Sequence, residues 1–200
     1  MVTLYHAPLS RSVRVLWLLE ELGLPYELAA VQFTPPTKPF TQNTPGGKVP
    51  AIRDGDVTMF ESGAIVEYLL ERYGNGRLAP PLGSPLRASY LQWIHFAEAT
   101  AFLGLANIGF HRLFKQDADA LPTAMADYET WVVGMLDVLE RALAGRSYLL
   151  GEEISGADVM MGYTVWVARG LGVLRDAHPT VGGYLARVEA RPAFQKALST

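Results

Sequence analysis

Strand-like patterns in this sequence stop at about residue 60, and this limit constrains the fold more than any other feature. Before it, the order is strand (2–6), helix, strand (26–31), a loop rich in Pro, Thr and Gly, and two short strands around Asp54-Gly55-Asp56. An Asp-Gly pair between apolar runs is a hairpin signal. A second helix, 62–73, follows. The first part is therefore predicted to be a β-α-β / β-β-α unit.

The rest of the chain has the periodicity of helices only. Apolar positions recur at helical spacing in five segments: 85–115, 123–144, 157–171, 180–190 and 193–199. The segment 76–84, with its glycines and prolines, reads as a linker. We predict an α/β domain at residues 1–75, a linker at 76–84 and an all-helical domain at 85–200.

The composition argues against several kinds of partner. The net charge is −3 and no basic tract is present, so nucleic acid and anionic membranes are poor candidates. No apolar stretch approaches the ~20 residues of a membrane span, and the N-terminus lacks a secretory signal pattern. We expect a soluble, cytoplasmic protein. Charged residues are 18% of the chain, against about a quarter in typical domains, which is compatible with surface buried in an oligomer.

The chain has no cysteine, which removes disulfides, cysteine-ligated zinc and cysteine nucleophiles. Any thiol chemistry must therefore use a thiol supplied by a ligand. The four histidines are scattered without metal-ligand spacing, so no metal site is expected.

Two helix starts look alike and differ in one residue. Ser155-Gly-Ala-Asp158 has an acid three residues after the serine and can close a capping box. Ser62-Gly-Ala-Ile65 lacks that acid, so its helix N-terminus keeps N–H groups that favour a carboxylate or phosphate. Glu61 could accept from an ammonium group, and together the two would suit the α-amino acid end of a ligand. Judged on local sequence alone, an ordinary solvated cap is the more common case.

The first helix start, Ser10-Arg11-Ser12, also lacks a downstream acid. A hydroxyl there could stabilise a thiolate by hydrogen bonding. Lowering a thiol pKa by two units requires about 2.7 kcal/mol, and one charge-assisted hydrogen bond of ~1.5–3 kcal/mol is of that order. A plain N-cap is again the alternative.

Four segments together carry a family resemblance: LYHAPLSRSVRVLWLLEELGLPYE (4–27), GGKVPAI (46–52), ESGAIVEYL (61–69) and SGADVMMG (155–162). In this order and spacing the chain resembles a cytosolic, bacterial-type glutathione S-transferase over nearly its whole length. The resemblance implies a thioredoxin-like first domain, an all-helical second domain, glutathione as co-substrate and a homodimer.

The resemblance also implies roles for the turn residues and the second helix start. Val49-Pro50 looks like the family's Val-Pro turn with a cis proline, where the backbone of Val49 pairs with the cysteinyl part of glutathione. Glu61 and Ser62 look like the pair that holds the γ-glutamyl end.

The remaining glutathione contacts are placed in the same way. Lys48, and Lys38 or Gln42, would reach the glycyl carboxylate. Ser10 looks like the hydroxyl that faces the thiol, with Ser12 a close second because the helix start can be drawn at either. Tyr5, an aromatic in the first strand, is not assigned a catalytic role.

The resemblance places the second substrate between the domains, a common position for a pocket. The candidates are apolar or aromatic residues from both parts of the chain: Leu9, Phe33, Phe102, Phe110, His111 and Phe114. Aromatic residues at helical spacing can equally be core, and His111 can equally lie on the surface.

The resemblance favours a glutathione transferase that presents bound glutathione as a thiolate to a hydrophobic electrophile in detoxification. A glutathione-dependent isomerase or peroxidase, and a non-catalytic ligand- or protein-binding module on the same fold, remain as alternatives. The sequence identifies neither the electrophile nor the class within the family.

Overall fold

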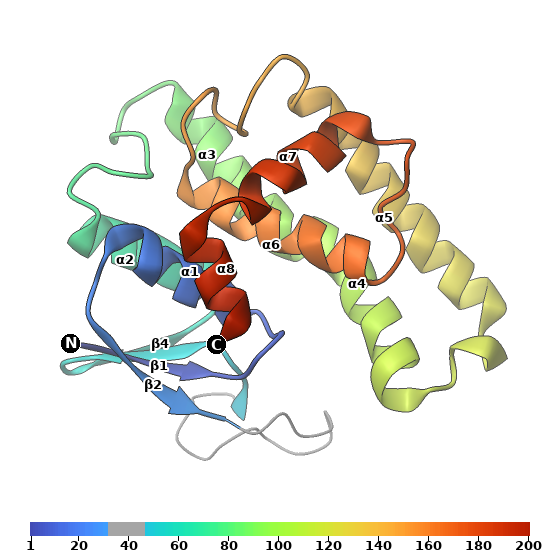
Figure 1. Ribbon diagram of the computed structural model, residues 1–200, viewed down its shortest axis with the longest axis horizontal. Helices are drawn as coiled ribbons and strands as arrows, with labels where there is room; N and C mark the ends of the chain where they lie inside the picture. The colour runs from blue at the N-terminus through green and yellow to red at the C-terminus, as the bar shows by residue number, and fades with distance from the viewer. Residues whose placement is uncertain (32–46) are drawn as a thin grey trace. The chain divides into compact units, whose positions relative to one another are not determined.

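The computed structural model describes residues 1–31 and 47–200 (Figure 1). Contacts between Cα atoms divide the chain into two compact units. Unit 1 comprises residues 1–81 together with 189–200, and unit 2 comprises residues 82–188. The first unit carries the sheet, and the second is helical.

The sheet of unit 1 has four strands in the order β2-β1-β3-β4. They are β1 (Val2–His6), β2 (Tyr26–Ala30), β3 (Ala51–Asp54) and β4 (Val57–Phe60). β1 runs parallel to β2 and antiparallel to β3, and β3 and β4 form the hairpin that the Asp-Gly signal predicts. The predicted β-α-β / β-β-α unit with a thioredoxin-like sheet is confirmed.

Three helices of unit 1 lie on the same side of this sheet: α1 (Ser12–Leu22), α2 (Ser62–Tyr73) and α8 (Pro192–Ser199) (Figure 1). α1 connects the parallel strands β1 and β2 and ends at Gly23, whose φ of 67° is most easily adopted by a residue without a Cβ. α1 begins at Ser12, which is one of the two starts that the sequence allows.

The C-terminal segment differs from the sequence prediction, because residues 189–200 belong to unit 1 and not to the helical unit. α8 packs on α1, where the Phe194 ring meets Trp17 edge to face with 4.7 Å between centroids. Helical periodicity shows that a segment is a helix but not which unit it packs against, so the sequence could not assign α8 correctly. The predicted boundaries at 75 and 84 stay a prediction.

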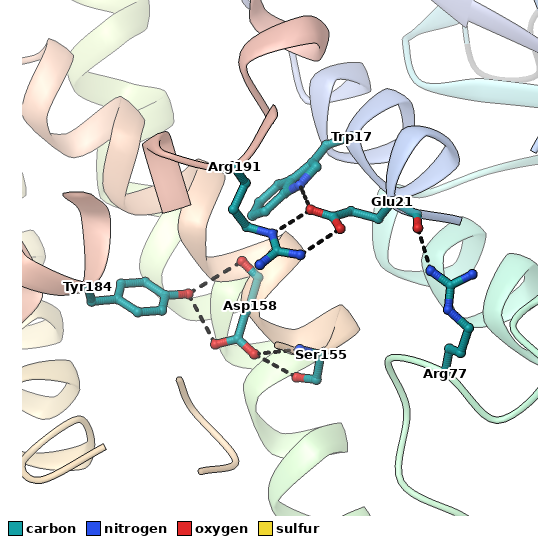
Figure 2. Close-up of polar contacts among 7 residues, drawn as sticks. All are labelled: Trp17, Glu21, Arg77, Ser155, Asp158, Tyr184 and Arg191. Carbon is teal, nitrogen blue, oxygen red and sulfur yellow. Dashed lines mark hydrogen bonds and ion pairs between the residues drawn. The ribbon is translucent and has the colours of Figure 1, made fainter. Parts of the chain in front are cut away.

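Glu21 on α1 binds the C-terminal segment 189–200 through Arg191 (Figure 2). Arg191 donates to both carboxylate oxygens of Glu21 (Nε–Oε1 2.6 Å, Nη2–Oε2 2.7 Å), and Trp17 Nε1 donates to Oε1 at 2.8 Å. Arg77 reaches the backbone carbonyl of Glu21 at 2.6 Å. Burial acts to raise the pKa of Glu21, but the hydrogen bonds from Arg191 and Trp17 outweigh it and hold this pKa below its usual value.

Unit 2 begins with one long helical run, as predicted for 85–115, but one π-helical segment interrupts it and a second forms its end. Its elements are α3 (Leu86–His95), η2 (Phe96–Thr100), α4 (Ala101–Gly109), η3 (Phe110–Lys115), the 3-10 turn η4 (Ala118–Ala120), α5 (Pro122–Ala142), α6 (Gly156–Gly170) and α7 (Pro179–Glu189). α4 and α5 approach closely at Gly104, where a Cβ would lie 2.7 Å from Val132 Cγ2. None of the described helices is both long enough and apolar enough to cross a membrane.

The capping box predicted for Ser155 and Asp158 is confirmed at the start of α6 (Figure 2). Asp158 accepts from the Ser155 N–H at 2.9 Å and from its hydroxyl at 2.8 Å. It also accepts from the Leu149 N–H at 2.9 Å and from the Tyr184 hydroxyl at 3.3 Å. At this helix start an acid within the chain therefore binds both donors of the N-cap serine.

Arg191→Ala should lower the free energy of unfolding by about 2 kcal/mol, because it leaves the nearly buried carboxylate of Glu21 without its cation. Lys196→Ala is the matched control on α8. It removes an exposed partner of Glu20 and should cost less than about 1 kcal/mol. Urea unfolding measures both.

The Arg191→Ala deficit should shrink as the pH falls below about 4.5, the usual pKa of Glu21. A group with a lowered folded-state pKa stabilises the fold above its unfolded pKa, and this contribution is lost as the pH falls through the folded value. Equal losses in the two variants at neutral pH would contradict the role of the Glu21–Arg191 pair.

Candidate functional site

The loop between β1 and α1 brings two serine hydroxyls together. Ser10 Oγ lies 2.7 Å from Ser12 Oγ, donates to the Ala7 carbonyl at 2.7 Å and accepts from the Ser12 N–H at 3.2 Å. Leu9, just before them, is largely exposed and has a φ of 59°, a strained value for a branched residue. Strained backbone in a polar loop is typical of a functional segment.

The two serines are not equivalent in the fold. Ser12 is fully buried, and its hydroxyl contacts the Ala7 N–H at 3.2 Å, the Ala7 carbonyl at 3.1 Å and His6 Nδ1 at 2.8 Å. Ser10 is partly exposed. Where the sequence left both open, the structure makes Ser10 the hydroxyl that a ligand could reach, with Ser12 behind it.

The turn before β3 contains a cis peptide bond between Val49 and Pro50, as predicted. The Val49 side chain is buried in a small apolar cluster with Ala7 and Val31, and Tyr5 packs against this cluster. Within residues 1–31 and 47–200, the backbone N–H and C=O of Val49 have no hydrogen-bond partner. Val49 is therefore anchored by its side chain and keeps its backbone groups for other contacts.

The start of α2 is the third part of the site. It has no side-chain cap and no acid in its first turn. Glu61 is exposed with φ 74° and ψ 110°, far from the common regions, while Ser62 is almost fully buried. Ser62 Oγ accepts a hydrogen bond from Arg14 Nη1 at 3.0 Å, although 48 residues separate them.

Arg14 is fully buried, so this hydrogen bond links the first turns of α1 and α2 inside unit 1. Because Ser62 Oγ accepts from Arg14, its own O–H remains to donate. Two helix N-termini without an acid in their first turns, together with a buried guanidinium, favour anionic groups nearby.

The other predicted glutathione contacts are only partly described. Lys48 is exposed next to Val49. Lys38 and Gln42, and Phe33 of the predicted second pocket, lie outside the described residues.

The helical candidates for the second pocket occur along α4 and η3. Phe102 is partly buried, and its ring stacks on that of Tyr163 with 6.3 Å between centroids. The ring of Phe110 meets the His111 ring edge to face with 5.3 Å between centroids. His111 Nδ1 lies 2.8 Å from Asp117 Oδ1, and Phe114 is 39% exposed. Their role as pocket lining stays a prediction.

Within unit 2 there is an apolar cavity of about 10 Å³ among α4, α5 and α6, room for little more than one water. None of the four predicted helical residues lines it, so it is not the predicted pocket. Among the residues that the structure describes, no group of three or more His, Asp or Glu side chains could hold a metal ion.

Two buried polar residues of the site are not among the residues predicted to bind or react: His6, and Arg14, which the sequence suggests only as a cation near a thiolate. The sequence does give a signal for His6, because it continues the buried face of β1 after Val2 and Leu4, where an apolar residue is expected. Arg14 falls in the same way among the buried residues of α1. A polar residue at an apolar position of a regular pattern would have identified both.

The sequence matches known proteins in both units. A profile of the glutathione S-transferase N-terminal domain matches residues 4–79, and one of the C-terminal domain matches residues 122–187. The glutathione S-transferase-like protein OpS6 of Beauveria bassiana is 32% identical, covering 94% of this chain and 89% of its own. The disulfide-bond oxidoreductase YfcG of Escherichia coli is 30% identical, covering 99% of this chain and 94% of its own.

The chain belongs to the glutathione S-transferase family. Solved structures of this family have the same fold. A Pseudomonas putida glutathione transferase with one glutathione disulfide bound per subunit has a TM-score of 0.86 and 30% identity, covering 98% of this chain and 90% of its own. A Pseudomonas fluorescens family member with two glutathione bound has a TM-score of 0.85 and 29% identity. The match covers 98% of this chain and 92% of the Pseudomonas chain.

Glu61→Gly should raise the free energy of unfolding by about 1 kcal/mol, because relief of ~1–3 kcal/mol of backbone strain exceeds the entropy cost of glycine. Ala64→Gly, exposed in the same helix with helical backbone, should instead lower it by about 1 kcal/mol. Thermal and urea unfolding compare the two, and equal destabilisation would show that position 61 stores no strain.

Proposed function

We propose that this family member is a glutathione transferase that binds glutathione as a thiolate beside Ser10. The thiolate attacks a hydrophobic electrophile, as a detoxifying enzyme would. One observation carries the proposal: the Arg14–Ser62 hydrogen bond links two helix N-termini that have no acid in their first turns. A ligand with a thiolate and a carboxylate meets favourable positive potential at both.

The proposed positions of the ligand follow from these groups. The γ-glutamyl carboxylate accepts from the hydroxyl of Ser62 and the first N–H groups of α2, and Glu61 accepts from the ammonium group. The cysteinyl backbone pairs with Val49 at the cis Pro50 turn. Lys48, with Lys38 or Gln42, takes the glycyl carboxylate.

The chemistry needs no protein nucleophile, which fits a chain without cysteine. The thiol of glutathione loses its proton to solvent, and the Ser10 hydroxyl donates to the resulting thiolate. The sulfur then forms a bond to the electrophilic carbon while the leaving group departs with its electron pair. Binding both partners in one site makes the reaction effectively intramolecular. Leu9, Phe33, Phe102, Phe110, His111 and Phe114 are proposed to hold the electrophile.

A second function within the same site is disulfide or peroxide reduction, or isomerisation, through bound glutathione. The 30% identity to a disulfide-bond oxidoreductase favours considering it. Turnover of a chlorodinitrobenzene-type electrophile, compared with an organic hydroperoxide and a small disulfide, separates these activities. A folded chain that is not retained on immobilised glutathione would instead favour a non-catalytic module. We further propose a cytoplasmic homodimer, and light scattering in solution tests the dimer.

Ser10→Ala should raise the pKa of the bound glutathione thiol by about 1–2 units, because it removes one charge-assisted hydrogen bond of ~1.5–3 kcal/mol. kcat at neutral pH should fall ~10–100-fold, with recovery at alkaline pH. Ultraviolet titration of the bound thiolate measures the pKa directly. A thiol pKa unchanged in Ser10→Ala would remove Ser10 from the proposed mechanism.

The paired helix starts give a second, independent prediction. Ser62→Ala should weaken glutathione binding about tenfold by removing a donor to its carboxylate. Ser155→Ala, at the self-satisfied start of α6, should leave binding unchanged and lower the free energy of unfolding by ~1 kcal/mol. Calorimetric titration with glutathione and urea unfolding separate the two effects. Equal effects on binding would contradict the different roles of the two serines.

A further inference from the structure

His6 ends β1 directly behind the serine pair and is 4% exposed. Its Nδ1 lies 2.8 Å from Ser12 Oγ, whereas Nε2 is shielded from solvent and has no hydrogen-bond partner among residues 1–31 and 47–200. Burial lowers the pKa of His6, so the ring is neutral at pH 7 and carries a single N–H.

The position of that single proton is restricted by the surroundings. A proton on Nε2 would leave a buried N–H without an acceptor. A proton on Nδ1 is donated to Ser12 Oγ and leaves only a lone pair unpaired on Nε2. Buried donors without partners are rarer in proteins than acceptors with unused lone pairs. The surroundings therefore favour the Nδ1–H tautomer.

This tautomer fixes the direction of the next hydrogen bond. Ser12 Oγ then accepts from His6 Nδ1–H and from the Ala7 N–H at 3.2 Å, which uses both of its lone pairs. Its own O–H must be donated, and Ser10 Oγ at 2.7 Å is a closer acceptor than the Ala7 carbonyl at 3.1 Å.

Ser10 is restricted in turn. Its Oγ accepts from the Ser12 O–H and from the Ser12 N–H at 3.2 Å, so both lone pairs are occupied. The one remaining capacity of the Ser10 hydroxyl is to donate. It donates to the Ala7 carbonyl at 2.7 Å in the protein as it stands, and a rotation about the Cβ–Oγ bond can turn it to another acceptor.

We propose that His6 is a positioning residue whose Nδ1–H orients the Ser12 and Ser10 hydroxyls as a one-way chain of donors ending at the ligand sulfur. This rests on the proposed function, because it assumes that an anionic sulfur binds at Ser10. Hydrogen bonds aligned in one direction polarise one another, by about 10–30% per bond, so the terminal hydroxyl stabilises a thiolate better than an isolated serine. Such a chain cannot take the thiol proton, so that proton leaves to solvent.

The first test needs no ligand and uses a variant only to assign signals. Nitrogen-15 NMR of histidine-labelled protein at neutral pH should show the His6 ring with a protonated Nδ1 and an unprotonated Nε2. Assignment of the His6 signals uses the loss of one histidine in His6→Asn. A ring protonated at Nε2 would overturn the inference and leave the proposed function untouched.

The second test uses two variants of similar shape. His6→Asn keeps an N–H donor near the position of Nδ1, and His6→Leu removes it. His6→Leu should raise the pKa of the bound glutathione thiol by about one unit and lower kcat about tenfold at neutral pH, with KM for glutathione changed less than twofold. His6→Asn should stay within about 0.3 units of the wild type.

The outcomes separate this inference from the proposed function. A merely structural role of His6 would lower the melting temperature without moving the thiol pKa. If Ser10→Ala raises the thiol pKa and His6→Leu does not, the relay is wrong and the function stands. An equal shift in both His6 variants also overturns the relay. Failure of the wild-type protein to bind glutathione overturns the function and the relay together, whereas the NMR result on the tautomer is independent of it.

Discussion

The site depends on a buried cation that joins two helix starts. Arg14 is inaccessible to solvent, yet it lies on α1 and donates to Ser62 at the beginning of α2. A buried guanidinium is costly unless its donors have partners, so the hydrogen bond to Ser62 constrains how the starts of the two helices lie relative to each other. Both helix starts lack acidic caps, so the positive potential of this region is not cancelled locally.

The two serine oxygens at the site, those of Ser62 and Ser10, both accept hydrogen bonds from groups within the protein. Ser62 accepts from Arg14 and Ser10 accepts from the Ser12 N–H, so the O–H of each serine is left to donate; in Ser10 it donates to the Ala7 carbonyl. Asp158 shows the opposite arrangement, because this acid within the chain accepts from both the N–H and the hydroxyl of Ser155 at the start of α6. The same Ser-Gly-Ala sequence thus stands at two different helix starts. At 155 an acid of the chain binds the serine, and at 62 the first turn contains no acid.

Much of the fold of unit 1, and part of the candidate site, could be predicted from the sequence. The order of strands and helices along unit 1, the Asp54-Gly55 hairpin and the capping box at Ser155 depend on neighbouring residues, and the structure bears them out. The cis bond at Val49-Pro50 is implied by the family resemblance, and the structure has it. The choice between Ser10 and Ser12 could not be read, because it depends on which hydroxyl the fold buries. His6 and Arg14 act through contacts that the loop geometry creates, and the partner of α8 lies about 170 residues earlier in the chain.

The return of residues 189–200 to unit 1 makes that unit discontinuous in sequence, with the helical unit inserted between its two parts. During synthesis the whole of unit 2 leaves the ribosome before Phe194 can complete the core beside Trp17. One side of α1 therefore stays uncovered until residues 189–200 emerge. Until then the unit that contains Ser10, Val49 and Glu61 is not fully packed. Assembly of the candidate site is coupled to synthesis of residues 189–200, so a polypeptide that stops short of residue 189 contains every described residue of this site but lacks the helix that packs on α1.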